Sequence, residues 1–227
     1  MAKTAILVDG GFYRKKFEKG LSHSPSEAAD ALVRYCFRHL EEPHMEHELY
    51  RIFYYDAPPC SKKIFHPLHN RTFDFSKSDF YVWMNSFLKE LTKKRKMALR
   101  LGSIDDSTAS YVLTGSVTKD IVTGKRKLDS LTDADFVPSI KQKGVDMKIG
   151  MDISSLAYKK QVEQIVLIAG DSDFVPAAKL ARREGIDFIL DPLGAHIKEE
   201  LFEHIDGKRS CGNPYIKGGK DNAPYKI

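Results

Sequence analysis

The sequence predicts an α/β protein with a mainly parallel sheet in one domain. Two short apolar segments, residues 4–8 and 165–169, are typical of strands that are buried on both faces. Segments with helical spacing alternate with strand-like segments along most of the chain, which is the pattern of βαβ units. The chain has 227 residues, of which 42% are hydrophobic, and this is enough for a sizeable core.

The first half of the chain is predicted to run strand, helix, strand, helix, strand. The corresponding ranges are residues 4–8, 25–41, 49–55, 79–97 and 98–101. The first strand ends in a tight turn at Asp9-Gly10-Gly11. Ser24 before Pro25 is a favourable helix start, because serine caps the free backbone N–H groups and proline is tolerated at the first helical position.

The second half begins with an insertion, residues 103 to about 140, which is less regular and holds short strands near 111–114 and 136–140. Regular alternation then returns as helix, strand, helix, strand, helix, at about 146–160, 165–169, 175–184, 186–190 and 195–204. Residues 208–227 are basic and interrupted by glycine and proline, which predicts a flexible tail. The predicted domain is therefore residues 1–207.

Composition excludes several classes of protein. No apolar run approaches the ~20 residues of a membrane-spanning helix, and the N-terminus lacks the order of a secretory signal, so we expect a cytoplasmic protein. Three cysteines, an odd number at wide spacing, do not form a zinc pattern. The net charge is +5, and a homo-oligomer stays an open alternative.

Acidic side chains follow the two most apolar strands. Asp9 ends the first, and Asp171 and Asp173 come directly after residues 165–169; Asp146 opens the helix that precedes that strand. If the two strands are neighbours, these acids converge at the carboxyl edge of the sheet, where ligands of open parallel sheets bind. Clustered carboxylates repel one another unless a cation neutralises them, and an oxygen-only ligand set suits Mg²⁺ or Mn²⁺.

Each acid also has an ordinary structural interpretation. Asp9 could be a turn residue, and Asp171 and Asp173 could cap the helix that follows, because Asp is favoured at both kinds of position. For Asp146 the capping interpretation is stronger. Asp152 lies six residues later, about 240° around the helix, so we rank it below the others as an additional acid.

Four motifs resemble the NYN domains of the PIN-like nuclease superfamily, in particular their LabA-like bacterial branch. They read AILVDGGFY, YRIFYYDAPP, KGVDMKIGMDI and IVLIAGDSDFVPAAKLARREG, and together they span most of residues 4–205. The resemblance implies a PIN-like three-layer α/β/α fold with a central, mainly parallel sheet. It also implies Mg²⁺ or Mn²⁺ held by acids, and endoribonuclease activity or another RNA-linked role.

Carried over position by position, the resemblance assigns the metal-binding and catalytic acids to Asp9, Asp146, Asp171 and Asp173. One position departs from the family pattern. Many members have an Asn shortly after the first Asp-Gly, where this chain has Gly11-Phe12-Tyr13. The insertion at 103–140 is longer than the usual family connection, and nothing is carried over onto it.

A polyanionic substrate also needs cations. Arg14 and Lys15 follow the Asp9 turn, Lys143 stands beside Asp146, and Ser172 could donate to a phosphate, so these are the candidate substrate-binding residues. The basic segment at 89–100 could bind phosphates without sequence preference, but such runs are more often a solvated helix face.

These observations favour a metal-dependent endoribonuclease that hydrolyses RNA phosphodiesters in single-stranded or structured RNA. The alternative is a catalytically weak RNA-binding or regulatory module that retains the fold. A phosphatase with an aspartate nucleophile is disfavoured, because Gly11 stands where its second acid is needed. The histidines are scattered and receive no role, since they lack metal-type spacing: His66, His69, His196 and His204.

Overall fold

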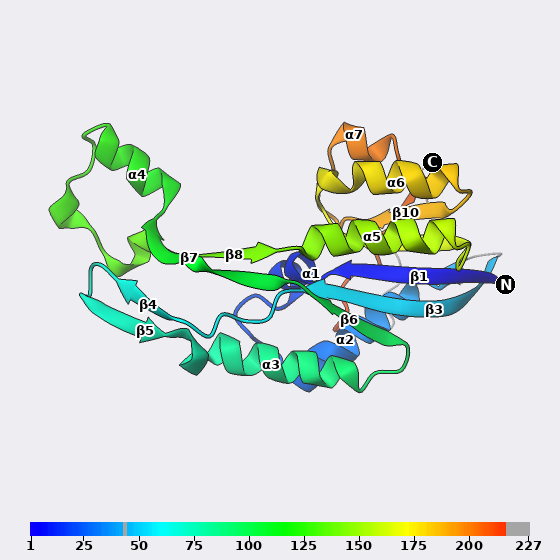
Figure 1. The fold of residues 1–227 in the computed structure, drawn as a ribbon, viewed down its shortest axis with the longest axis horizontal. Helices are drawn as coiled ribbons and strands as arrows, with labels where there is room; N and C mark the ends of the chain where they lie inside the picture. The colour runs from blue at the N-terminus through cyan, green and yellow to red at the C-terminus, as the bar shows by residue number, and fades with distance from the viewer. Residues whose placement is uncertain (43–44, 217–227) are drawn as a thin grey trace.

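The computed structural model describes residues 1–42 and 45–216, which form a central sheet covered by helices on both faces (Figure 1). The helices are α1 (Gly10–Phe17), α2 (Pro25–Arg38), α3 (Asp79–Thr92), α4 (Gly115–Val122), α5 (Val145–Tyr158), α6 (Val175–Arg183) and α7 (Glu199–Phe202). Four short 3-10 turns are η1 (Phe75–Lys77), η2 (Leu128–Ser130), η3 (Asp133–Asp135) and η4 (Ser172–Phe174).

Six parallel strands make the central sheet, in the order β11, β10, β9, β1, β3, β6. A short strand, β2 (Glu41–Glu42), pairs antiparallel with the start of β3. The six strands are β1 (Ala2–Asp9), β3 (Met45–Asp56), β6 (Met97–Leu101), β9 (Gln164–Ile168), β10 (Asp187–Asp191) and β11 (Gly207–Lys208). β1 and β9 are direct neighbours, with Val8 opposite Ile168, which confirms that the two apolar segments pair side by side.

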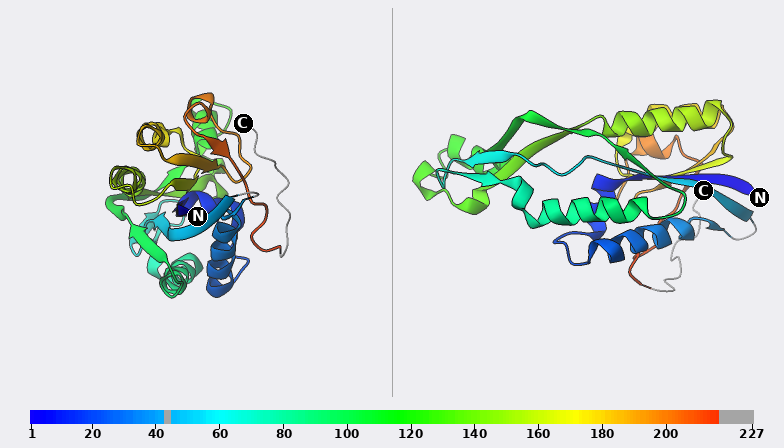
Figure 2. Two further views of the ribbon diagram at one scale, coloured as in Figure 1. Left: turned by 90° about the vertical axis from the view of Figure 1, so that its right-hand side faces the viewer. Right: turned by 60° about the horizontal axis from the view of Figure 1, so that its bottom comes forward.

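The residues of β1 are buried alternately in two cores. Ala5 and Leu7 belong to the core under α5 and α6, whereas Ile6 and Val8 belong to the core under α1, α2 and α3. Because both faces of the strand are covered, its sequence is apolar throughout rather than alternating. Figure 1 and Figure 2 show the resulting three layers, with α5, α6 and α7 on one face and α2 and α3 on the other. This confirms the predicted α/β fold with a mainly parallel sheet, which is consistent with a PIN-like fold.

A distal arm extends beyond one end of the sheet (Figures 1 and 2). It consists of the hairpin β4 (Lys63–His66) and β5 (Arg71–Asp74), the ribbon β7 (Ser103–Leu113) and β8 (Phe136–Lys143), and α4. The segment 103–140 is thus more regular than its sequence indicates. Its strands are solvated on both faces for much of their length and lack the apolar alternation of a half-buried strand.

Other differences from the sequence-based expectation are local. α1 was expected to be only a turn, and the helix expected at 195–204 is reduced to the four residues of α7. The first part of the predicted tail, residues 208–216, is described by the structure, and Arg209 and Cys211 in it are buried. Residues 217–227 of the predicted tail lie outside the described residues. No described helix combines the length and apolarity that a membrane crossing requires.

Candidate functional site

Asp9 is the last residue of β1 and the N-cap of α1. Its Oδ1 accepts a hydrogen bond from the backbone N–H of Phe12 at 3.1 Å, which fixes the carboxylate at the edge of the sheet. The next residue must be small, because a Cβ at Gly10 would lie 2.6 Å from Oδ2 of Asp56 and closer still to the Tyr54 ring. The Asp-Gly pair therefore reflects both a helix cap and a close backbone approach.

Asp146 and Asp171 come from two other parts of the chain. Asp146 lies in the first turn of α5, which starts after Gly144 with its left-handed φ of 77°. Asp171 follows β9, and its Oδ1 accepts a hydrogen bond from the backbone N–H of Asp173 at 3.1 Å. Both carboxylates are exposed. The capping interpretation is thus correct for Asp171 and wrong for Asp146, because the N-cap of α5 is Gly144. Asp9 does more than end a turn, since it caps α1.

The three acids line one cavity of about 480 Å³, the acidic cavity. Its full lining is Asp9, Gly11, Phe12, Lys15, Gln142, Gly144, Val145, Asp146, Gly170, Asp171, Ser172 and Lys198. Asp173 instead lines an adjoining groove between α5 and α6, to which Asp146 also contributes. The fold therefore brings together acids that are up to 162 positions apart, as expected from their place at the ends of neighbouring strands.

The acids influence one another electrostatically. Burial raises the pKa of Asp9, and the charges of Asp146 and Asp56 raise it further, against the lowering effect of the hydrogen bonds from Phe12 and Gly11. Partial burial in the cavity raises the pKa of Asp146, although the residue is exposed overall, and the charges of Asp171 and Asp173 raise it further. A cation in the cavity would relieve this repulsion.

The donor set of the cavity fits a hard divalent cation. It offers carboxylate oxygens and no described histidine or cysteine, which suits Mg²⁺ or Mn²⁺. The acids of the cavity are not packed as closely as the ligands of a bound metal. Among the described residues, three side chains that could bind a metal bring their ligand atoms within 4.8 Å of one another at a different place, and they are His66, His69 and Asp133. Mg²⁺ keeps several of its waters and is usually bound through one or two carboxylates, so a looser set of acids suits it.

Two lysines, a glutamine and a serine complete the polar lining. Lys15 extends from α1 and lines the cavity, and Lys198 donates a hydrogen bond to Oγ of Ser172 at 3.1 Å. Lys198 and Gln142 carry no motif in the sequence. Only the folded chain places them here, Gln142 at the end of the distal arm's β8 and Lys198 just before α7.

Three of the candidate residues point elsewhere. Asp152 accepts hydrogen bonds from Tyr55 Oη at 2.8 Å and from Arg100 Nε at 3.0 Å. Arg14 forms a two-pronged ion pair with the buried Asp56, at 2.9 and 3.0 Å. In the described residues none of these side chains lines the acidic cavity.

Lys143 is the third of these residues. It pairs with Asp105 at 2.6 Å, and hydrogen bonds from Lys143 and Ser107 lower the pKa of Asp105 to about 2. The basic segment at 89–100 is largely engaged on the protein surface, since Lys93 pairs with Glu90 and Lys94 with Asp30. Its ion pairs agree with the solvated-face interpretation.

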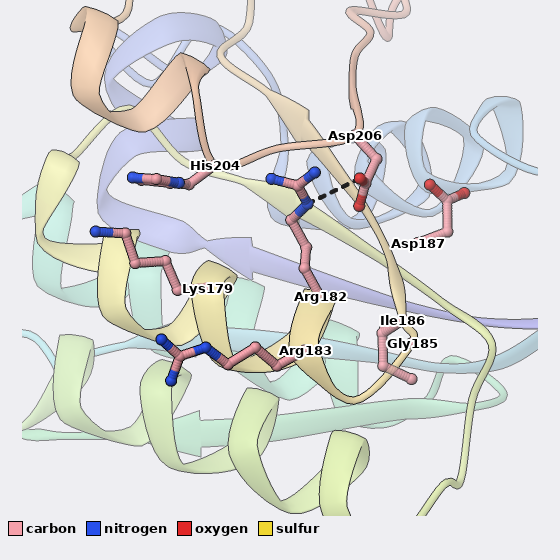
Figure 3. A pocket seen from close by; sticks show the side chains of 8 residues that line it. All are labelled: Lys179, Arg182, Arg183, Gly185, Ile186, Asp187, His204 and Asp206. Atoms are coloured by element: carbon pink, nitrogen blue, oxygen red, sulfur yellow. Dashed lines mark hydrogen bonds and ion pairs between the residues drawn. The ribbon is translucent and has the colours of Figure 1, made fainter.

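A larger basic cavity, of about 740 Å³, lies beside the amino end of β10 (Figure 3). Lys179, Arg183 and His204 line it, and Arg182 Nε donates a hydrogen bond to Oδ1 of Asp206 at 2.8 Å. Because the strands of the sheet are parallel, this cavity is at the edge opposite the acids. It is therefore separate from the candidate site.

Residues 116–201 match the family model of the NYN domain, a range that contains Asp146, Asp171 and Asp173 but not Asp9. No match was found among curated proteins. A crystal structure of a protein of unknown function from Vibrio parahaemolyticus is 14% identical over 91% of each chain, with a TM-score of 0.47. The family match supports the NYN family and, together with the observed sheet, a PIN-like nuclease fold.

Proposed function

We propose that this protein is a metal-dependent endoribonuclease that hydrolyses RNA phosphodiesters in the acidic cavity with Mg²⁺ or Mn²⁺. The observation that carries the proposal is the meeting of three acids from separate segments, Asp9, Asp146 and Asp171, in one cavity rimmed by lysines. The match to the NYN domain supports it, and the LabA-like branch stays a prediction.

The acids would hold the cation. Asp9, Asp146 and Asp171 face the cavity, and Asp173 approaches from the adjoining groove. When bound, a divalent cation polarises a phosphoryl oxygen and lowers the pKa of bound water. The hydrogen bonds from the backbone of Phe12 to Asp9 and of Asp173 to Asp171 orient two of these carboxylates in advance.

The remaining lining suits an RNA backbone. Lys15 and Lys198 supply positive charge beside the acids, and Ser172 offers a hydroxyl that is already oriented by Lys198. The ring of Phe12 lines the cavity, whereas Tyr13 is fully buried, so Phe12 is the aromatic residue available to stack on a base.

The direct test is RNA cleavage by Asp171→Asn. Asparagine retains the oxygen that accepts from the Asp173 backbone but removes the charge, so we expect at least a hundredfold loss of Mn²⁺-dependent cleavage of a labelled RNA. Asp152→Asn is the matched control, because Asp152 is a carboxylate that lies outside the acidic cavity and is paired with Arg100. Equal cleavage by the wild type and Asp171→Asn would refute the site.

A second candidate function has its own supporting observation. In the part of the chain that the structure describes, no three of the four acids bring their oxygens within 4.8 Å of one another, which favours an RNA-binding module with weak catalysis. It predicts that the wild type binds RNA in a gel-shift assay but leaves it intact with Mn²⁺. The cytoplasmic location and the oligomeric state remain predictions from the sequence.

A further inference from the structure

Three side chains in the distal arm, His66, His69 and Asp133, converge from two segments (the histidine cluster). His66 ends β4, His69 lies in the turn before β5, and Asp133 opens η3. The Nε2 atoms of His66 and His69 lie 3.2 and 2.7 Å from the same atom, Oδ1 of Asp133. The spacing of the histidines gives no sign of this cluster, because Asp133, which joins the pair, is 64 residues away from His69.

The ring of His66 is held in a fixed position. Its side chain is 3% exposed, and its centroid lies 4.3 Å from the ring of Tyr111, 5.1 Å from Phe136 and 5.6 Å from Phe73. His69 and Asp133 are 36% and 69% exposed on the other side of the cluster. The cluster therefore has a rigid aromatic base and a side that is open to solvent.

The local fold also positions Asp133. The next acid in η3, Asp135, accepts hydrogen bonds from the backbone N–H and hydroxyl of Thr132 at 2.7 and 2.8 Å. Arg126 donates to both oxygens of Asp135, at 2.8 and 2.6 Å. Asp135 is thus fully engaged in holding the turn, and Asp133 is left as the carboxylate that faces the histidines.

We propose that Nε2 of His66, Nε2 of His69 and Oδ1 of Asp133 bind a divalent transition metal of the Zn²⁺ type, with water completing the coordination. Two imidazoles and a carboxylate suit such an ion and do not suit Mg²⁺, which prefers oxygen ligands alone. With bonds of about 2.0 Å, tetrahedral ligands stand about 3.3 Å apart, so the separation of His69 and Asp133 must open by about half an ångström. Both side chains are exposed enough to move that far.

Binding has one identifiable cost. The backbone N–H of His69 lies 3.5 Å from Nδ1 of His66 and donates to it, which places the His66 proton on Nε2, toward Asp133. The metal must displace this proton, and the long hydrogen bond at Nδ1 is then lost. In return, the ion would tie the β4–β5 hairpin to η3 and so stabilise the distal arm. This role is independent of the acidic cavity, with which the cluster shares no residue.

The test is a Co²⁺ titration of the untagged full-length chain after removal of metal with a chelator. We expect a visible absorption band of tetrahedral type that corresponds to one Co²⁺ per chain and that Zn²⁺ abolishes by displacement. His69→Ala should weaken binding at least tenfold, and so should Asp133→Asn, which keeps the carbonyl oxygen as a hydrogen-bond acceptor and preserves the fold.

Two controls separate this site from others. His204→Ala removes a histidine from the basic cavity of Figure 3, and Asp171→Asn alters the acidic cavity; both should retain the band. The proposal is overturned if the wild type shows no band, if the band survives Asp133→Asn, or if it disappears in Asp171→Asn. It is also overturned if Zn²⁺ leaves the thermal midpoint of the wild type unchanged, because a ligand that binds only the folded state must raise it.

Discussion

Asp9 combines a structural and a chemical task in one side chain. It caps α1 through the Phe12 N–H, and it also lines the acidic cavity. Because folding raises its pKa, the folded protein holds the Asp9 proton to a higher pH than the unfolded chain does. Protonated Asp9 therefore stabilises the fold at pH values below the pKa of Asp9 in the unfolded chain. This contribution is lost as the pH rises through the pKa of Asp9 in the folded protein. At neutral pH the ionised carboxylate is a cost to the metal-free protein.

Asp9→Asn should consequently stabilise the metal-free protein at pH 7. Asparagine caps helices about as well as aspartate, so the variant removes the charge but keeps the cap. We expect a rise in the thermal midpoint of about 1–3 °C, corresponding to roughly 0.5–1 kcal/mol. The rise should disappear as the pH is lowered below the usual range of an aspartate. The control Asp152→Asn loses its ion pair with Arg100 and should show no rise in the thermal midpoint. A lower midpoint for Asp9→Asn than for the wild type at pH 7 would contradict the idea that the charge of Asp9 destabilises the metal-free protein.

At the scale of elements, the sequence predicts best the strands that are buried on both faces and the helices that bury one apolar face. Both apolar strands and the capped helix α2 could be predicted, and Ser24 and Glu27 form the reciprocal capping box there. α1 cannot be predicted in this way, because it is short, basic and starts directly at the end of β1. β7 and β8 are longer than the short strands that the sequence predicts, because a ribbon exposed on both faces needs no apolar alternation.

The start of α1 makes a sharp prediction about Gly10 and Gly11. Gly10→Ala would place a Cβ 2.6 Å from Oδ2 of Asp56 and against the Tyr54 ring, which is hydrogen-bonded to that carboxylate. We expect a loss of about 1–3 kcal/mol in the free energy of unfolding, measured by urea denaturation. Gly11→Ala is the matched control, since its Cβ would meet only Asp9 Oδ1, at an ordinary 3.4 Å. Equal stability of the two variants would argue against the close approach.

At the scale of the whole molecule, the acidic cavity arises from sheet topology. β1 and β9 are neighbours although more than 150 residues separate them, and this pairing brings Asp9 and Asp171 to one edge. Such convergence can be predicted, because the carboxyl ends of parallel strands share an edge. The place of Lys198 in the cavity and the pairing of His66 with Asp133 could not be predicted. Both depend on how loops and the distal arm fold onto distant segments of the chain.

Calorimetric titration with Mn²⁺ tests the central claim, that the acids of the cavity together bind a divalent cation. The account predicts saturable binding to the wild type, at least tenfold weaker binding to Asp146→Asn, and unchanged binding to Asp152→Asn. The same titration in His69→Ala should match the wild type, which separates this site from the histidine cluster. Wild-type heats no larger than dilution, or an isotherm that Asp146→Asn leaves unaltered, would contradict it.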